Sequence, residues 1–167
     1  RIAVPYTGMI VSTRESADCR KKLLELGISQ VSGGSKTSVG GYFQPMPEKE
    51  DSAQFDVSDR RPLDEVIKWL MELGYLPSFC TACYRNGRTG DRFMEICKDK
   101  QIHNFCHPNA ILTLKEYLED YASPETKVVG EELIAKEQRT LECSEGVKLK
   151  VAEDLEKIEK GGRDFNF

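Results

Sequence analysis

The sequence predicts an α/β chain in which a βαβ unit is followed by a mostly helical region. Between residues 9 and 32, an apolar β-branched run, an amphipathic stretch and a second β-branched run follow one another with short connections. Segments joined in this way form a strand, a helix and a parallel strand. From Pro62 onward, apolar residues recur at helical spacing, and the last part of the chain is highly charged. We therefore expect helices to dominate the second part.

The first strand is expected at residues 9–13, MIVST, which are compact and largely β-branched. Ser16 is placed to cap a helix over residues 17–26, and Gly27 is placed to end it. The apolar side of this helix is expected to consist of Leu23, Leu24 and Leu26. The second strand is expected at residues 28–32, ISQVS, and the glycine-rich loop GGSKTSVGGY follows it. Loops at the carboxyl ends of parallel strands commonly bind ligands.

A polar stretch that contains prolines, residues 44–61, indicates a boundary loop. We expect one domain at residues 1–60 and a second at residues 61–167. Pro62 then starts an amphipathic helix, which Gly74 ends. Its apolar face is expected to be formed by Val66, Ile67, Trp69, Leu70 and Leu73.

Three further helical stretches are expected along the rest of the chain. A short helix is expected at residues 91–98. In TLKEYLEDYA, Thr113 is the expected cap and Glu116 completes a capping box. Residues 124–160 are charged and are expected to be helical.

The composition indicates a packed core and gives no sign of a nucleic-acid or membrane surface. The chain has 167 residues, of which 39% are apolar and 31% charged, so it can bury a core and stay in solution. The formal net charge of −4 and the lack of a basic run argue against nucleic acid as a partner. No stretch has the apolar length of a membrane span, and we find no secretory signal. We therefore expect a cytoplasmic protein, and the start at Arg1 suggests a cut inside a larger one.

The cysteines form the most specific pattern of the sequence. Cys80, Cys83 and Cys106 are spaced as Cys-x2-Cys-x22-Cys, and Cys97 lies between them. Two cysteines separated by two residues can bring both thiolates to one metal centre, and a third can close the site. The glycines and arginines of RNGRTG, residues 85–90, allow tight wrapping and can offset the charge of metal-bound thiolates. The pattern predicts a metal site rather than a disulfide framework.

The spacing alone leaves two kinds of metal site open. A structural zinc needs four ligands, which the three cysteines and either His103 or His107 would supply. An iron–sulfur cluster usually takes four cysteines, and three would leave one iron open to an external ligand. Cys97 is expected to be a small buried hydrophobe on the short helix. Cys19 and Cys143 have no partner by spacing.

The stretch LGYLPSFCTACYRNGRTGDRFMEICKDKQIHNFCHPNAILTLKEYLEDYASPET resembles the carboxy-terminal region of the radical S-adenosylmethionine tyrosine lyases that mature iron–iron hydrogenase. The segments RIAVPYTGMIVSTRES and ISQVSGGSKTSVGGY are similar to the end of the barrel of these enzymes. The thiamine-pathway tyrosine lyase shares that barrel region but lacks the cysteine extension. The cysteine pattern therefore favours the hydrogenase-maturation family, and the resemblance covers nearly the whole chain.

The resemblance implies a fold and an activity for the parent protein. The fold is a (β/α)8 radical S-adenosylmethionine barrel, followed by a mostly helical auxiliary iron–sulfur cluster domain. One 4Fe-4S cluster and S-adenosylmethionine generate a radical that cleaves tyrosine to p-cresol and dehydroglycine. Dehydroglycine gives carbon monoxide and cyanide. An auxiliary 4Fe-4S cluster captures them for the hydrogenase, and this cluster carries a labile extra iron that is bound by a cysteine. Other hydrogenase maturases are the implied protein partners.

Within that family, Cys80, Cys83 and Cys106 match the three ligands of the auxiliary cluster. The histidine that helps to hold the extra iron belongs to the barrel in these enzymes, so His103 and His107 do not inherit its role. The Cys-x3-Cys-x2-Cys signature of the radical cluster is absent from this chain. We therefore assign no catalytic residue here and do not expect the chain to be active alone.

The resemblance also suggests residues that bind tyrosine or S-adenosylmethionine. Arg14 follows the first expected strand, and its guanidinium suits the tyrosine carboxylate by a bidentate fit. The alternative for Arg14 is a surface ion pair with Glu15. Ser32 and Ser35 can hydrogen-bond a ligand from the loop after the second strand, although turn chemistry explains them equally well. The weaker candidates are Thr7 and Thr13.

Overall fold

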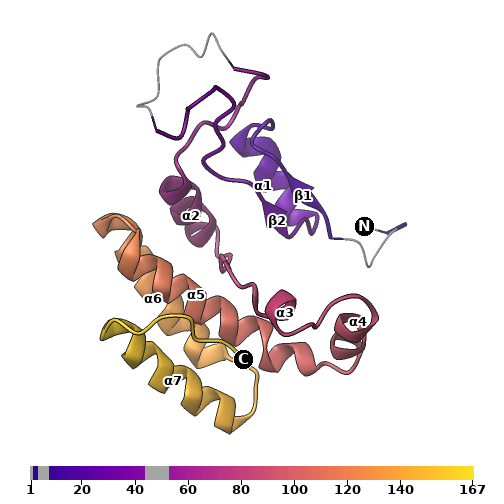
Figure 1. Ribbon diagram of the computed structural model, residues 1–167, viewed down its shortest axis with the longest axis vertical. Helices are drawn as coiled ribbons and strands as arrows, with labels where there is room; N and C mark the ends of the chain where they lie inside the picture. Colours follow the sequence, from indigo (N-terminus) through magenta and orange to yellow (C-terminus); the bar gives the residue numbers. More distant parts are fainter. Residues whose placement is uncertain (1, 4–7, 44–52) are drawn as a thin grey trace. The chain divides into compact units, whose positions relative to one another are not determined.

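A computed structural model describes residues 2–3, 8–43 and 53–167 (Figure 1). The chain divides into two compact units, Arg1–Val66 and Ile67–Phe167. The described strands lie in the first unit, and most of the helices lie in the second. The structure is therefore helix-rich with one small sheet. Among the described residues, no helix has both the length and the apolar character that crossing a membrane requires.

The first unit contains the βαβ unit that the sequence predicts. Strands β1 (Ile10–Val11) and β2 (Gln30–Val31) are parallel, with Val11 opposite Val31. Helix α1 (Ala17–Glu25) connects them and lies beside the strands in Figure 1. Both strands are shorter than expected, and Ile10 on β1 is 65% exposed.

Local interactions define the ends of α1, as the sequence predicts. The Ser16 side chain accepts a hydrogen bond from the Cys19 N–H at 3.3 Å. Gly27 follows the helix with a φ of +93°, a conformation that glycine adopts without a Cβ penalty. Leu24 is buried, but Leu26 is 71% exposed, so its assignment to the apolar side was wrong. Leu26 is the C-cap of the helix, where the periodicity of the apolar face no longer applies.

Helix α2 (Leu63–Glu72) contains the point at which the two units divide. Pro62 precedes the helix, and Gly74 follows it with a φ of +83°. The predicted apolar face is confirmed in part, since Val66, Ile67 and Leu70 are buried at helical spacing. Trp69 and Leu73 are only half-buried, and Leu73 lies beyond the end of the helix, whereas Met71 is buried although it was not predicted.

Three long helices build the second unit: α5 (Cys106–Asp120), α6 (Pro124–Thr140) and α7 (Glu145–Glu159). Figure 1 shows them side by side, and α5 contacts both of the others. Ser123 and Ser144 cap α6 and α7 with their side-chain oxygens. The core between the helices includes side chains that are at most 1% exposed: Ile111, Leu112, Leu114, Leu118, Val151 and Ile158.

The cysteine-rich stretch forms short helices between α2 and α5. These are α3 (Ala82–Arg85), α4 (Gly90–Lys98) and the 3-10 helix η1 (Gln101–Asn104). The short helix predicted at residues 91–98 is thus confirmed within one residue. Each of these helices is too short to carry a core of its own, and they position the cysteines around the beginning of α5.

Thr113 is not a helix cap, and this prediction was wrong. Helix α5 begins at Cys106, so Thr113 lies inside it. The Thr113 hydroxyl donates to the Asn109 carbonyl oxygen at 2.8 Å, an interaction that threonine can make within a helix. Glu116 does not complete a capping box, because its carboxylate accepts a hydrogen bond from the Phe165 N–H at 3.2 Å.

Candidate metal centre

Cys80 and Cys83 lie at the tight turn that opens α3. Cys80 precedes the helix, and Cys83 is on it. The Ala82 N–H donates to Cys80 Sγ at 3.4 Å, so a backbone amide points at this sulfur. Hydrogen bonds to cysteine sulfurs are one means by which proteins tune iron–sulfur clusters. The Phe79 N–H donates to Thr113 Oγ1 at 3.3 Å and so anchors the turn to α5.

Cys106 is the first residue of α5, and its thiol shares an electrostatic environment with the other cysteines of the stretch. The pKa of Cys106 is raised to about 11, chiefly by desolvation, although the residue as a whole keeps solvent exposure. The negative charges of Cys83, Cys80 and Cys97 contribute to this rise, and the positive charge of Arg88 opposes it. These thiols therefore influence the Cys106 thiol electrostatically. A cation bound here would favour the thiolate forms that bind metals.

Cys97 lies on α4 and is half-buried, so the prediction that it is a buried hydrophobe holds only in part. Helix α4 contacts η1 and has no fully buried residue. Desolvation raises the pKa of Cys97, and the charge of Cys83 adds to the effect. Cys97 is therefore close enough to sense the charge of the Cys-x2-Cys turn, while its helix is held by few neighbours.

The described residues do not form a site for a single metal ion. Within residues 2–3, 8–43 and 53–167, no group of three or more His, Cys, Asp or Glu side chains is placed to hold one ion. His107 Nε2 lies 2.8 Å from Glu137 Oε2, so this ring is engaged by a carboxylate. A zinc ion would need four ligands converging to about 2.0–2.3 Å. In a cluster, different irons carry different thiolates, so the cysteines need not converge on one point.

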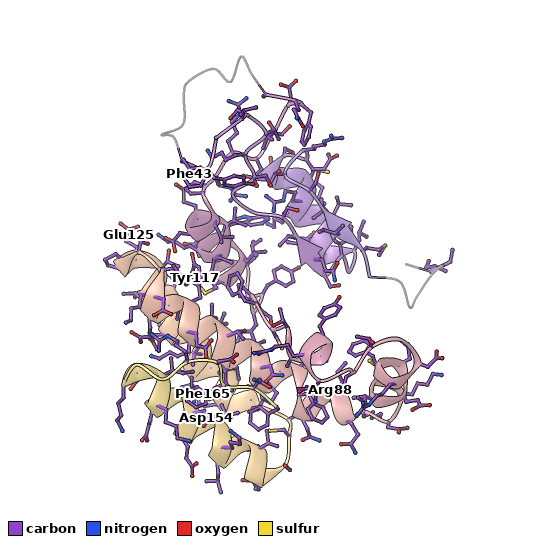
Figure 2. The ribbon with its side chains drawn as sticks, in the orientation of Figure 1. Phe43, Arg88, Tyr117, Glu125, Asp154 and Phe165 are labelled. Carbon is purple, nitrogen blue, oxygen red and sulfur yellow. The ribbon has the colours of Figure 1, made fainter. Side chains whose placement is uncertain are left out.

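Arg88 adds a positive charge to this region (Figure 2). Its side chain is buried, with the residue 9% exposed, and its guanidinium carbon lies 4.5 Å from the centre of the Phe105 ring. The Arg88 N–H donates to the Cys83 carbonyl oxygen at 2.8 Å, and Arg88 Nη2 donates to the Phe167 carbonyl oxygen. Arg88 Nε is buried and has no hydrogen-bond partner among the described residues. A buried donor without a partner thus belongs to a side chain that stacks on Phe105, the residue before Cys106.

The candidates for substrate binding in the first unit occupy different environments. Arg14 is exposed, and its guanidinium carbon lies 3.9 Å from the centre of the Phe55 ring. In the described part of the chain it makes no ion pair with Glu15, the alternative considered for it. Ser32 and Ser35 are half-buried in the loop after β2.

Of the two weaker candidates, only Thr13 belongs to the described residues, and it is buried. Thr13 is only 3% exposed, and its carbonyl oxygen accepts a hydrogen bond from the Asp59 N–H at 2.9 Å. Thr7 lies outside the described residues.

Two residues that organise these loops were not found from the sequence. Arg20 is fully buried on α1 and forms an ion pair with Asp59, which is 4% exposed. Arg20 also donates to the Ser32 carbonyl oxygen. A signal for Arg20 was present, because it lies one helical turn before the buried Leu24 and so shares its face.

Comparisons with known proteins relate this geometry to other chains. Residues 1–76 match the family described as the Biotin and Thiamin Synthesis associated domain. The 2-iminoacetate synthase of Escherichia coli (strain K12) is 42% identical over 62 residues, which cover 37% of this chain and 16% of that protein. The 2-iminoacetate synthase of Salmonella typhimurium (strain LT2) is 38% identical over 77 residues, which cover 46% and 20%.

A solved structure matches the whole chain. The crystal structure of HydG, described as a maturase of FeFe-hydrogenase, has a TM-score of 0.90 and 52% sequence identity. The match covers 100% of this chain and 35% of that chain. The chain therefore spans about a third of HydG and a smaller share of the curated synthases. The family match ends before Cys80, so the cysteine site lies outside the matched domain.

Proposed function

We propose that the chain is a carboxy-terminal part of a HydG-type protein, a radical S-adenosylmethionine tyrosine lyase of hydrogenase maturation. The observation that carries the proposal is the 52% identity to HydG over the whole chain, with a TM-score of 0.90. The similarity of part of the chain to 2-iminoacetate synthases supports the same class of lyase. In this proposal, residues 1–60 complete a (β/α)8 barrel and residues 61–167 form the domain for an auxiliary iron–sulfur cluster.

Cys80, Cys83 and Cys106 are the proposed ligands of the auxiliary 4Fe-4S cluster. Their shared electrostatic environment and the amide that points at Cys80 Sγ fit a cluster bound by thiolates. The buried positive charge of Arg88 would offset part of the negative charge of the ligands. When bound, the cluster would supply an open iron position. That position would meet a labile extra iron with its cysteine ligand, and carbon monoxide and cyanide would be captured there.

Arg14 is the proposed contact for the tyrosine carboxylate. A guanidinium that stacks on the Phe55 ring keeps its N–H groups free to point outward in the ring plane. Those groups can donate two parallel hydrogen bonds to a carboxylate. The hydroxyls of Ser32 and Ser35 would hydrogen-bond tyrosine or S-adenosylmethionine from the loop after β2. Thr7 and Thr13 are kept as secondary candidates.

The proposed reaction belongs to the whole protein and not to this chain alone. The rest of the protein would bind S-adenosylmethionine and a second 4Fe-4S cluster, which this chain cannot do because it lacks the Cys-x3-Cys-x2-Cys signature. Tyrosine would be cleaved to p-cresol and dehydroglycine, and the derived carbon monoxide and cyanide would enter an iron–carbonyl–cyanide unit for the hydrogenase H-cluster. We place this work in the cytoplasm, with other hydrogenase maturases as partners.

The metal content of the full-length protein tests this proposal. The protein that contains this chain is purified anaerobically, and its iron, acid-labile sulfide and zinc are measured together with its absorption spectrum. We expect Cys80→Ala and Cys106→Ala to lose the iron and sulfide of one cluster, whereas Cys143→Ala keeps both. One zinc per chain after anaerobic reconstitution, with no cysteine-dependent iron, would instead support a structural Cys3His zinc module.

A further inference from the structure

We propose that Arg88 is the fixed positive charge of the cysteine site, and that the segment Arg163–Phe167 is a strap that holds Arg88 in place. This inference rests on the proposed function, because it assigns Arg88 a role toward a cluster at Cys80, Cys83 and Cys106. Arg88 is a positioning and charge-compensating residue in this proposal and not a metal ligand.

Arg88 has no Asp or Glu partner among the described residues, unlike the fully buried Arg20, which pairs with Asp59. Arg88 is 9% exposed, and its Nη2 is bonded to a backbone oxygen of Phe167, the last residue of the sequence. Its Nε is buried and has no hydrogen-bond partner among the described residues. An anion beside Arg88 would satisfy this orphan donor.

The position of Arg88 makes the cysteine site the source of that anion. The Arg88 backbone is bonded to Cys83, and its guanidinium lies over the ring of Phe105, the residue before Cys106. Thiolates that bind iron would supply such an anion.

The strap runs along one face of α5 and ends at Arg88. Arg163 donates to both carboxylate oxygens of Asp120, at 2.8 Å and 2.5 Å. The Phe165 N–H donates to Glu116 at 3.2 Å, one turn closer to the beginning of the helix. At the far end, the Asn109 side chain binds the Phe167 backbone twice. It accepts from the Phe167 N–H at 2.9 Å, and its Nδ2 lies 3.4 Å from the Phe167 carbonyl oxygen.

The Phe167 carbonyl oxygen therefore serves two partners at once. It accepts from Asn109, which is 1% exposed, and from Arg88 Nη2. The rings of Phe165 and Phe167 pack against the helical core, so the strap is held by apolar contacts as well. With its carbonyl oxygen fixed in this way, one edge of the Arg88 guanidinium is fixed too.

A fixed positive charge beside an iron–sulfur cluster favours the reduced state, because reduction adds negative charge. Charge and hydrogen bonding near a cluster are among the factors that set its reduction potential. Removal of the Arg88 charge should therefore shift the midpoint potential of this cluster to a more negative value. Loosening of the strap should have a smaller effect in the same direction, because the charge is retained but is less well placed.

The test uses the full-length protein with the cysteines of its S-adenosylmethionine cluster replaced, so that only the cluster at the Cys80 site is observed. Iron and sulfide are measured, and the midpoint potential is determined by a redox titration followed by electron paramagnetic resonance. The variants are Arg88→Met, Arg88→Lys and Asn109→Ala. Arg139→Met is the matched control, since it removes an exposed arginine of α6 and changes the net charge equally.

We expect Arg88→Met to lower the midpoint potential, Asn109→Ala to lower it less, and Arg88→Lys to stay closer to the parent. Arg139→Met should leave it unchanged. If Arg88→Met does not assemble the cluster, the Arg88→Lys and Asn109→Ala values still decide the question. A potential that is the same in all variants would overturn the role of Arg88 while the proposed function stands. A parent protein that binds no iron or sulfide through Cys80, Cys83 and Cys106 would overturn both.

Discussion

Arg20 and Asp59 are 39 residues apart in the sequence and form a buried ion pair that connects the ends of both strands. Arg20 donates to the Ser32 carbonyl oxygen after β2, and the Asp59 N–H donates to the Thr13 carbonyl oxygen after β1 at 2.9 Å. Arg61 adds two side-chain hydrogen bonds to the Asp59 carboxylate, at 2.8 Å and 2.6 Å. This network positions the loops that carry the proposed substrate contacts.

Asp59→Asn should lower the free energy of unfolding by about 3 kcal/mol, because it leaves the buried Arg20 guanidinium without its counter-charge. Urea unfolding of the full-length protein at neutral pH measures this change. The control is Asp56→Asn, which alters an exposed carboxylate and should change stability by less than about 0.5 kcal/mol. Equal effects of the two substitutions would contradict the importance of the pair.

The same carboxylate predicts a dependence of stability on pH. Hydrogen bonds from Arg61 hold the pKa of Asp59 below its ordinary value; burial opposes this, and the charge of Arg20 supports it. Because the pKa is lower in the folded state than the ordinary value of about 3.9, the stabilisation is complete above about pH 5 and is lost as the pH falls through the folded pKa. The stability difference between the parent and Asp59→Asn should therefore be constant from about pH 5 to 7 and shrink below about pH 4.

Gly130→Ala should destabilise the contact between α5 and α6. A Cβ at Gly130 would lie 2.5 Å and 2.6 Å from the two methyl carbons of Leu118, which is 1% exposed. Overpacking of this kind costs about 1–3 kcal/mol, which exceeds the gain of about 1 kcal/mol in helix propensity. Gly146→Ala on α7 meets no atom within 4 Å and should be neutral or stabilising. Thermal unfolding that ranks the two variants in the opposite order would exclude this explanation.

Lys115→Met should cost about 2 kcal/mol of stability. The Lys115 side chain is 4% exposed, and its ammonium lies within 3.1 Å of carboxylate oxygens of Glu119, Glu131 and Glu159. Burial alone would lower the pKa of Lys115, but the hydrogen bonds that its ammonium donates to Glu131, Glu159 and Glu119 raise it above its ordinary value. The loss stays below that of a fully buried pair because Glu131 and Glu159 are partly exposed and can turn to water.

The control for Lys115 is Lys148→Met, which removes an exposed ion pair with Glu145 on α7. Exposed pairs contribute about 0–1 kcal/mol, so this variant should unfold near the parent midpoint in urea. A Lys148→Met effect as large as that of Lys115→Met would show that burial of the ammonium is not the cause.

Cys97→Ala should keep the full iron and sulfide of the cysteine site, whereas Cys83→Ala should lose them. Both cysteines are half-buried and interact electrostatically. A comparison of the two variants therefore distinguishes a cysteine that binds the metal from one that only lies nearby. The measurement is the metal and sulfide content of the anaerobically purified protein. Loss of iron from Cys97→Ala to the same extent as from Cys83→Ala would make Cys97 a ligand.

Arg14→Met should raise KM for tyrosine by about tenfold or more, since a hydrogen bond to a charged group contributes about 1.5–3 kcal/mol. The iron content should not change, because Arg14 lies in the first unit. Steady-state formation of p-cresol by the full-length protein gives KM and kcat separately. Lys21→Met, which removes an exposed charge from α1, is the matched control. An unchanged KM would remove Arg14 from the substrate site.

The sequence by itself determined the features that depend on neighbouring residues. The serine cap of α1, the glycine after α1 and most of the apolar face of α2 are local patterns, and they were found where they were predicted. The serine caps of α6 and α7 are local as well, but they were not predicted. The Cys-x2-Cys turn is local in the same sense, since its amide-to-sulfur contact joins residues two positions apart. Backbone geometry fixes such contacts whatever the rest of the chain does.

Only the tertiary structure decided which distant residues share an environment. Arg88 meets Phe167 across 79 residues, and Asn109 meets Phe167 across 58. No spacing rule connects these residues, because their contact depends on how α5, α6 and α7 pack and bring the last residues of the chain back to Arg88 and Asn109. For the same reason Thr113 could be mistaken for a cap, since the early start of α5 depends on packing as well as on its own residues. Charges buried at such contacts, above all Arg88, Arg20 and Lys115, became visible only once the helices were in place.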